Sequence, residues 1–210
     1  MTPLRPHQIE CVSDILRHYC AGANRQLVVA PVGFGKTRCF AALPHLICPN
    51  PDSRTTVWVH RDELAEQAAN ALAACNPGVS IGIEKADREA GDARIVVCSV
   101  QTLAGKVNGA KRLAKFNPDH FGLHVIDEAH RYVAPNFRKP LEHFRIVKGK
   151  TNDSSACAIG FTATPHRHDA IGLEALFDKI SYSNNLAAMI KSGWLAPVVA
   201  HRISTQIDLS

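Results

Sequence analysis

Seven residues, PVGFGKT at positions 31–37, are of the types that bind phosphate groups. They follow a short apolar run at 27–30 and precede residues that can form a helix, the setting of a phosphate-binding loop. Gly33 and Gly35 would keep side chains away from backbone N–H groups that point at phosphate oxygens. Lys36 would reach the terminal phosphates of a nucleoside triphosphate, and the Thr37 hydroxyl would ligate Mg²⁺. The alternative is an ordinary glycine turn between a strand and a helix.

A second set of reactive residues, Asp127, Glu128 and His130, follows an apolar run at 123–126. Adjacent carboxylates at the end of a buried strand lie at the carboxyl edge of a parallel sheet, where such folds bind ligands. There Asp127 could hold Mg²⁺, and Glu128 could orient and deprotonate an attacking water. An acidic turn after a strand is the alternative. The phosphate loop in the same chain favours the catalytic interpretation.

The elements that must position these residues alternate along the chain. We expect strands at residues 27–30, 56–59, 95–98, 123–126 and 157–161, and helices at 8–20, 37–46, 62–75 and 136–144. This alternation predicts an α/β fold with a mostly parallel central sheet and helices on both faces. Residues 148–155 are expected to form an exposed loop. We expect residues 1–196 to form the domain and 197–210 to be a linker or the start of an absent domain.

Composition limits the possible classes of protein. A chain of 210 residues that is 46% hydrophobic can bury one large core, although its length also permits two small domains. A formal charge of +5 permits a nucleic-acid partner without requiring one. The seven scattered cysteines contain no C-x-x-C pair, which indicates a reducing compartment and argues against disulfides or a zinc site. We expect a cytoplasmic protein with no membrane partner, since no signal core or membrane span is apparent.

Short motifs in a fixed order resemble those of superfamily 2 helicases. GFGKT at 33–37, DEAH at 127–130 and FTATP at 161–165 resemble motifs I, II and III, and LRPHQ at 4–8 resembles the adenine-reading Q-type motif. HRDEL at 60–64 and SVQTL at 99–103 resemble motifs Ia and Ib. TPHRHD at 164–169 and GWL at 193–195 are similar to the type III restriction-subunit branch. The resemblance implies the first RecA-like domain of a DEAH-box helicase, a P-loop NTPase fold.

The resemblance also implies residue roles, which fall into four groups. Nucleotide binding is implied for Arg5, Gln8, Gly33, Phe34, Gly35, Lys36 and Thr37, with Gln8 reading adenine. Catalysis is implied for Lys36, Asp127, Glu128 and His130, with Mg²⁺ held by Thr37 and Asp127. Thr162 and Thr164 would couple the γ-phosphate site to domain movement, while Arg61, Gln101 and Thr102 would contact a nucleic-acid backbone. The alternatives are a polar residue opening a surface helix (Gln8), a self-satisfied polar cluster (His130, Thr162 and Thr164) and a surface charge (Arg61).

The function that the resemblance implies is that of an ATP-hydrolysing motor domain of a nucleic-acid helicase or translocase. ATP and Mg²⁺ are its expected cofactors, and DNA is favoured over RNA as its track. A second RecA-like domain would supply arginine fingers, so this chain alone is expected to bind ATP but to hydrolyse it poorly. The alternative is a nucleotide-dependent nucleic-acid-binding module without hydrolysis, against which Glu128 argues. A P-loop kinase or GTPase is disfavoured by Gln8 and by residues 161–165.

Overall fold

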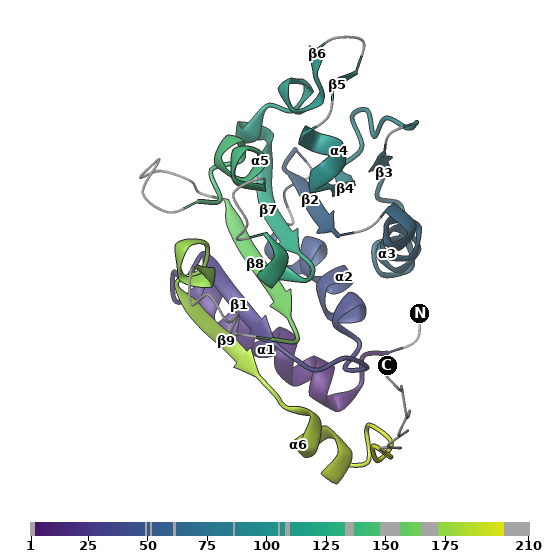
Figure 1. Ribbon diagram of the computed structural model, residues 1–210, viewed down its shortest axis with the longest axis vertical. Helices are drawn as coiled ribbons and strands as arrows, with labels where there is room; N and C mark the ends of the chain where they lie inside the picture. The colour runs from purple at the N-terminus through teal and green to yellow at the C-terminus, as the bar shows by residue number, and fades with distance from the viewer. Residues whose placement is uncertain are drawn as a thin grey trace, which may run out of the picture.

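A single parallel sheet organises the molecule (Figure 1). The computed structural model describes residues 3–48, 50, 52–60, 62–85, 87–104, 106–107, 110–132, 137–147, 156–164 and 172–199. Within these ranges seven strands pair in the order β3-β4-β2-β7-β8-β1-β9, and each of these pairings is parallel. The strands are β1 Arg25–Val29, β2 Arg54–Val59, β3 Ile81–Glu84, β4 Ile95–Ser99, β7 Phe121–Ile126, β8 Cys157–Thr162 and β9 Lys179–Ser183. A short antiparallel hairpin consists of β5 Lys106–Val107 and β6 Ala110–Lys111.

Helices cover both faces of this sheet. They are α1 Pro6–Cys20, α2 Lys36–Ile47, α3 Asp62–Cys75, α4 Val100–Ala104, α5 Arg138–His143 and α6 Leu186–Lys191. The core on one face contains residues from α1, α2 and α3, and the core on the other contains residues from α4 and α5. Within the described ranges no helix combines the length and the apolar character needed to cross a membrane.

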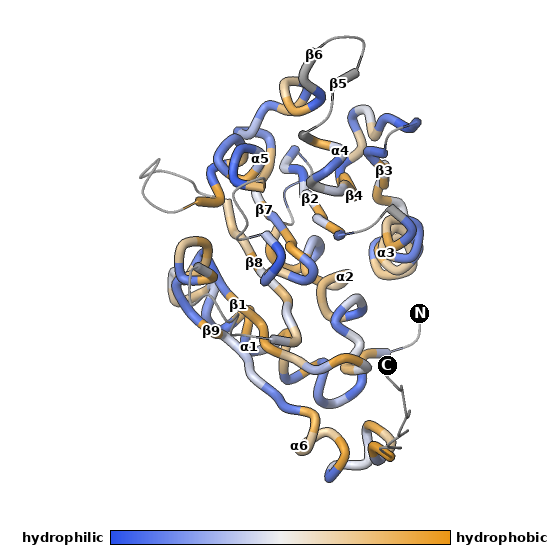
Figure 2. Tube along the Cα trace, in the orientation of Figure 1, coloured by the Kyte–Doolittle hydropathy of each residue, from blue (hydrophilic) through white to orange (hydrophobic). Residues whose placement is uncertain are grey.

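Each of the five inner strands, β1, β2, β4, β7 and β8, contributes residues to both cores. Val28 of β1 packs in the core beneath α1–α3, whereas its neighbours Leu27 and Val29 pack in the core beneath α4 and α5. This division follows from the two-residue repeat of a strand, which points successive side chains to opposite faces. Strands buried on both faces read as continuous apolar runs, and the hydrophobic end of β1 is visible in Figure 2.

The expected α/β fold is confirmed. All five expected strands and the first three expected helices are present, with boundaries that differ by at most two residues. The helix expected at 136–144 appears as α5, although residue 136 lies outside the described residues. Strands β3, β5, β6 and β9 and helices α4 and α6 were not expected, and the loop expected at 148–155 lies outside the described residues. One continuous sheet spans residues 25–183, which argues against two small domains.

A buried histidine lies in the centre of the sheet. The Nδ1 atom of His124 on β7 lies 2.7 Å from the Thr56 hydroxyl oxygen, which accepts a hydrogen bond of 2.6 Å from the Trp58 indole. The other ring nitrogen, Nε2, is buried and has no hydrogen-bond partner among the residues that the structure describes. Burial lowers the pKa of His124 to about 3, so the ring is neutral in the folded protein near neutral pH.

We expect this histidine to make the fold acid-sensitive. Unfolded chains bind a proton at His124 below about pH 6.5 and the folded chain does not, so stability falls as the pH decreases. We expect His124 to lower the free energy of unfolding by about 2 kcal/mol between pH 7 and pH 5. Urea unfolding at both pH values, for the unmodified chain and for His124→Leu, measures it. Equal pH dependence in the two chains would contradict the expectation.

Candidate nucleotide site

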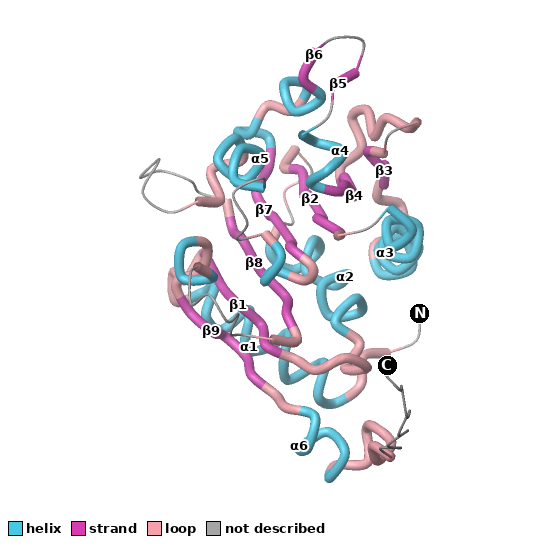
Figure 3. Tube along the Cα trace, in the orientation of Figure 1, coloured by secondary structure: helices cyan, strands magenta, loops and turns pink. Residues whose placement is uncertain are grey.

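Three adjacent strands bring the predicted site residues to one edge of the sheet. The carboxyl ends of β1, β8 and β7 lie in that order, and the loop that leaves β1 leads directly into α2 (Figure 3). The Ala30 backbone N–H donates to the Thr162 carbonyl oxygen over 2.9 Å. The His130 Nδ1 atom lies 2.9 Å from the Thr162 hydroxyl oxygen. The end of β8 therefore connects the phosphate loop to the acidic residues after β7.

The loop from residue 31 to 37 has the backbone geometry of a phosphate cradle. Gly33 and Gly35 have φ angles of 84° and 88°, in the left-handed region that side chains disfavour. A Cβ atom at Gly35 would also collide with the Gln8 side-chain nitrogen. Lys36 begins α2, and its ammonium group donates to the Ala30 carbonyl oxygen over 3.2 Å. The Lys36 side chain thus spans the loop, from the start of α2 to Ala30, and lies where it is predicted to bind phosphate.

Gln8 supports this loop from α1. Its Nε2 atom donates to the Phe34 carbonyl oxygen over 3.1 Å, and its Oε1 atom accepts from the Arg5 backbone N–H over 3.0 Å. The His7 Nε2 atom lies 3.2 Å from the same Phe34 oxygen. Gln8 is buried, so it does not merely open a surface helix. One amide hydrogen and one oxygen lone pair remain for the predicted contact with adenine.

The other two residues predicted to bind the cofactor differ in exposure. The Phe34 side chain is fully buried, so only its backbone is placed to face a ligand in the loop. Arg5 is exposed, and its guanidinium carbon lies 6.0 Å from the centroid of the Trp194 ring.

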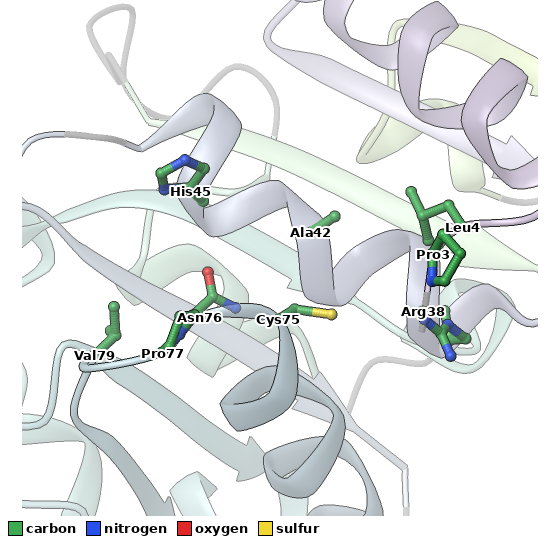
Figure 4. Close-up of a pocket in the computed structure, with 9 residues that line it drawn as sticks. All are labelled: Pro3, Leu4, Arg38, Ala42, His45, Cys75, Asn76, Pro77 and Val79. Atoms are coloured by element: carbon green, nitrogen blue, oxygen red, sulfur yellow. The ribbon is translucent and has the colours of Figure 1, made fainter. Parts of the chain in front are cut away.

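A pocket of about 450 Å³ runs along α2 (Figure 4). The residues that line it are Pro3, Leu4, Arg38, Ala42, His45, Cys75, Asn76, Pro77 and Val79. Leu4 and Arg38 lie together at one end of the pocket in Figure 4, and each is a sequence neighbour of a predicted nucleotide-binding residue. None of the predicted nucleotide-binding residues themselves lines this largely apolar pocket.

The acidic pair after β7 is electrostatically strained. Burial, together with repulsion from Glu128, raises the pKa of Asp127 to about 6, although the positive charge of Lys36 opposes this shift. Because the charge of Lys36 lowers the pKa of Asp127, the phosphate loop and the acidic pair lie within electrostatic range of each other. Glu128 has a φ angle of 50°, an uncommon left-handed conformation for a residue with a side chain. Such strain of order 1–3 kcal/mol concentrates at functional sites.

His130, Thr162 and Thr164 form a hydrogen-bonded chain. The Thr162 hydroxyl donates to the Thr164 carbonyl oxygen over 3.0 Å and accepts from the Thr164 N–H over 3.1 Å. Because that hydroxyl has one proton, His130 must donate its Nδ1–H to it. The same nitrogen lies 3.4 Å from a Glu128 carboxylate oxygen. The cluster satisfies its own hydrogen bonds, and its coupling role stays a prediction.

The residues predicted to contact nucleic acid are placed only in part. Arg61 lies outside the described residues. Gln101 is exposed in α4, directly after β4, and lines a small crevice with His60. The Thr102 hydroxyl oxygen accepts from the Ser99 hydroxyl over 2.9 Å. Gln101 and Thr102 therefore lie at the same sheet edge as the phosphate loop.

Sequence reasoning missed three residues beside the loop. His7 lies in the LRPHQ motif, and Trp194 and Leu195 lie in GWL, but these motifs implied no contact with the loop. The contacts join distant parts of the chain, which no local pattern specifies. Arg112 belongs to a basic stretch of the sequence that suits a solvated face, but its side chain is buried in an ion pair with Glu84.

Known proteins resemble this chain in sequence and in fold. The sequence profile of the family described as "Type III restriction enzyme, res subunit" matches residues 1–167. A relative from Schizosaccharomyces pombe, named as the mitochondrial ATP-dependent helicase irc3, is 36% identical over 212 residues, covering 98% of this chain and 33% of the relative. The chain spans about a third or less of the length of the curated relatives that it matches.

Two solved structures share the fold at low sequence identity. The Type ISP restriction-modification enzyme LlaGI, solved with a DNA substrate mimic, has a TM-score of 0.67 at 15% identity, over 92% of this chain and 21% of that one. The UvsW helicase of bacteriophage T4 has a TM-score of 0.63 at 15% identity, over 85% of this chain and 59% of that one. These likenesses confirm the expected RecA-like α/β fold. Since the profile match covers most of its length, the chain belongs to the family of the type III restriction enzyme res subunit, with the fold of the first RecA-like domain of superfamily 2 helicases.

Proposed function

We propose that this chain is the ATP-binding motor domain of an ATP-dependent helicase or translocase that acts on nucleic acid, with DNA favoured. The convergence of the phosphate loop, the acidic pair and Thr162 at one sheet edge is the observation that carries the proposal. Two relatives whose names describe ATP-dependent helicases support it, as do structures solved with DNA.

In this proposal the chain's own groups hydrolyse ATP by in-line attack of water on the γ-phosphate. Backbone N–H groups of the loop and the Lys36 ammonium would hold the phosphates and offset developing negative charge. Glu128 would accept the proton of the attacking water. The Glu128 carboxylate lies beside His130, which is hydrogen-bonded to Thr162 at the end of β8. This contact would orient the carboxylate, and it would make the position of β8 depend on whether the γ-phosphate is present.

Mg²⁺ fits the donor groups of the site. A hydroxyl from Thr37 in the first turn of α2 and a carboxylate from Asp127 are the oxygen ligands that Mg²⁺ prefers. A bound Mg²⁺ would neutralise phosphate charge. Asp127 is mostly ionised above about pH 6, so its carboxylate is ready to bind a cation near neutral pH.

A second domain and a nucleic acid would complete the motor. Residues 1–196 would form the first RecA-like domain, with 197–210 a linker or the start of a second one that supplies arginine fingers. Gln101, Thr102 and Arg61 would contact the nucleic-acid backbone. The scattered cysteines suit a reducing compartment such as the cytoplasm, whereas the relative from Schizosaccharomyces pombe is named as mitochondrial.

Phosphate release from Mg-ATP tests this proposal, measured without nucleic acid and with single-stranded DNA, duplex DNA or RNA. We expect ATP binding by calorimetry with slow turnover, because an arginine finger supplied by a second domain is worth about 10³–10⁵ in rate. Absence of ATP binding would refute the nucleotide site. Binding without hydrolysis under every condition, and also when a second RecA-like domain is supplied, would favour the binding module without catalysis.

A further inference from the structure

The segment that follows α6 is held firmly in place. The backbone N–H groups of Trp194 and Leu195 both donate to the Met189 carbonyl oxygen, over 3.0 and 3.2 Å. The Gly193 N–H donates to the Ile190 carbonyl oxygen over 2.9 Å, and Gly193 takes a left-handed φ of 73°. Met189 is itself buried in the core beneath α1–α3. Residues 193–195 therefore have a fixed path relative to the sheet.

This path contacts the phosphate loop. A Leu195 methyl carbon lies so close to Gly33 that a Cβ atom built at that glycine would be 2.8 Å from it. The Trp194 ring lies edge-on to the His7 ring with centroids 4.8 Å apart, and His7 in turn lies 4.9 Å from the Phe34 ring. Two consecutive residues after α6 thus contact two consecutive residues of the loop, directly or through His7.

We propose that Trp194 and Leu195 are positioning residues that clamp the phosphate loop and couple nucleotide binding to the path of the chain after α6. The inference rests on the proposed nucleotide site. Phosphate binding requires the loop N–H groups to converge. The clamp adds side-chain contacts at Gly33 and Phe34 to the contacts that Gln8 and His7 make with the Phe34 carbonyl oxygen. If the clamp stabilises the loop conformation that binds nucleotide, then bound nucleotide must stabilise the clamped position of residues 194–195 by the same free energy.

The two tryptophans allow a test in the unmodified chain. Trp58 is 0% exposed and Trp194 is 37% exposed, so acrylamide quenches Trp194 selectively. We expect saturating Mg-ADP to lower the quenching constant of Trp194, because the bound loop holds the ring against His7. Titration calorimetry with Mg-ADP reports binding independently of the fluorescence.

Variants provide the reciprocal test. Trp194→Ala and Leu195→Ala are each expected to weaken Mg-ADP binding about 5-fold or more, the lower range of coupling between sites. Trp194→Phe, which keeps an aromatic ring, should restore most of the affinity. Leu186→Ala is the matched control for Leu195→Ala, since Leu186 is exposed at the other end of α6 and should leave binding unchanged.

The outcomes separate this inference from the proposed function. If Mg-ADP binds by calorimetry but the quenching constant is unchanged or higher, or if both alanine variants bind normally, the clamp is refuted and the nucleotide site stands. If the unmodified chain binds neither Mg-ADP nor Mg-ATP, both proposals fail.

Discussion

Glu128→Gln is expected to lower the rate of ATP hydrolysis by about 10²–10⁴-fold while ATP binding is retained, because an amide cannot accept the proton of the attacking water. The substitution removes one of the two adjacent negative charges at the sheet edge. Repulsion from Glu128 raises the pKa of Asp127, so the variant should also ionise Asp127 at a lower pH. Mg-ATP binding by the variant should therefore persist to more acidic pH than in the unmodified chain.

The measurement is single-turnover phosphate release, with the chain in excess over ATP, so that slow hydrolysis by the single domain remains detectable. Glu66→Gln is the control, since Glu66 is an exposed carboxylate paired with Arg88 on the surface. A Glu128→Gln variant that releases phosphate at the unmodified rate would remove Glu128 from the proposed mechanism. An unchanged pH dependence of binding would contradict the coupling of the two carboxylates.

Arg112→Ala is expected to reduce the free energy of unfolding by about 3–5 kcal/mol, because it leaves a buried carboxylate without its counter-charge. Arg112 and Glu84 have side chains only 6% and 1% exposed, with nitrogen and oxygen 3.1 Å apart. Arg112 also donates to the Lys85 and Arg88 carbonyl oxygens, and so fixes the segment that follows the edge strand β3.

Urea unfolding checks this value against a neighbouring exposed pair. Lys115 lies 2.5 Å from Glu89 with both side chains exposed, so Lys115→Ala should cost no more than about 1 kcal/mol. The double variant Glu84→Gln with Arg112→Met should recover most of the stability that Arg112→Ala loses. It contains no buried charge, and the amide oxygen of the new glutamine can still accept a hydrogen bond from the Ala90 N–H. An Arg112→Ala cost as small as that of Lys115→Ala would show that the buried charge is not destabilising.

The sequence predicted the centre of the sheet far better than its edges. Strands β1, β2, β4, β7 and β8 are buried on both faces, so their residues form continuous apolar runs that any reading of the sequence detects. The edge strand β9 reads KISYS, with exposed residues at both ends, and resembles a loop. β3 contains only four residues. An edge strand needs little apolar surface, and it therefore leaves a weak pattern.

The same distinction applies to the site. Gly35, Lys36 and Asp127 were predicted because their chemistry is encoded within a few neighbouring residues. The bond from Gln8 to Phe34 spans 26 positions, and its partner is a backbone oxygen, which no residue type specifies. Arg112 reads as part of a solvated basic stretch, and only the folded chain reveals Glu84 beside it. Contacts between distant segments have no local signature.

The strand order also governs how the chain assembles on the ribosome. β1 bears the phosphate loop at its end, yet its two sheet neighbours are β8 and β9, which begin only at Cys157 and Lys179. At about 5–20 residues per second, β1 waits roughly 6–26 s after its own synthesis before β8 is made. Throughout that interval an apolar strand presents two unpaired edges, the condition in which nascent chains are prone to aggregate. The nucleotide site consequently forms only after β8 and β9 have been made, and ATP cannot assist the earlier folding steps of this domain.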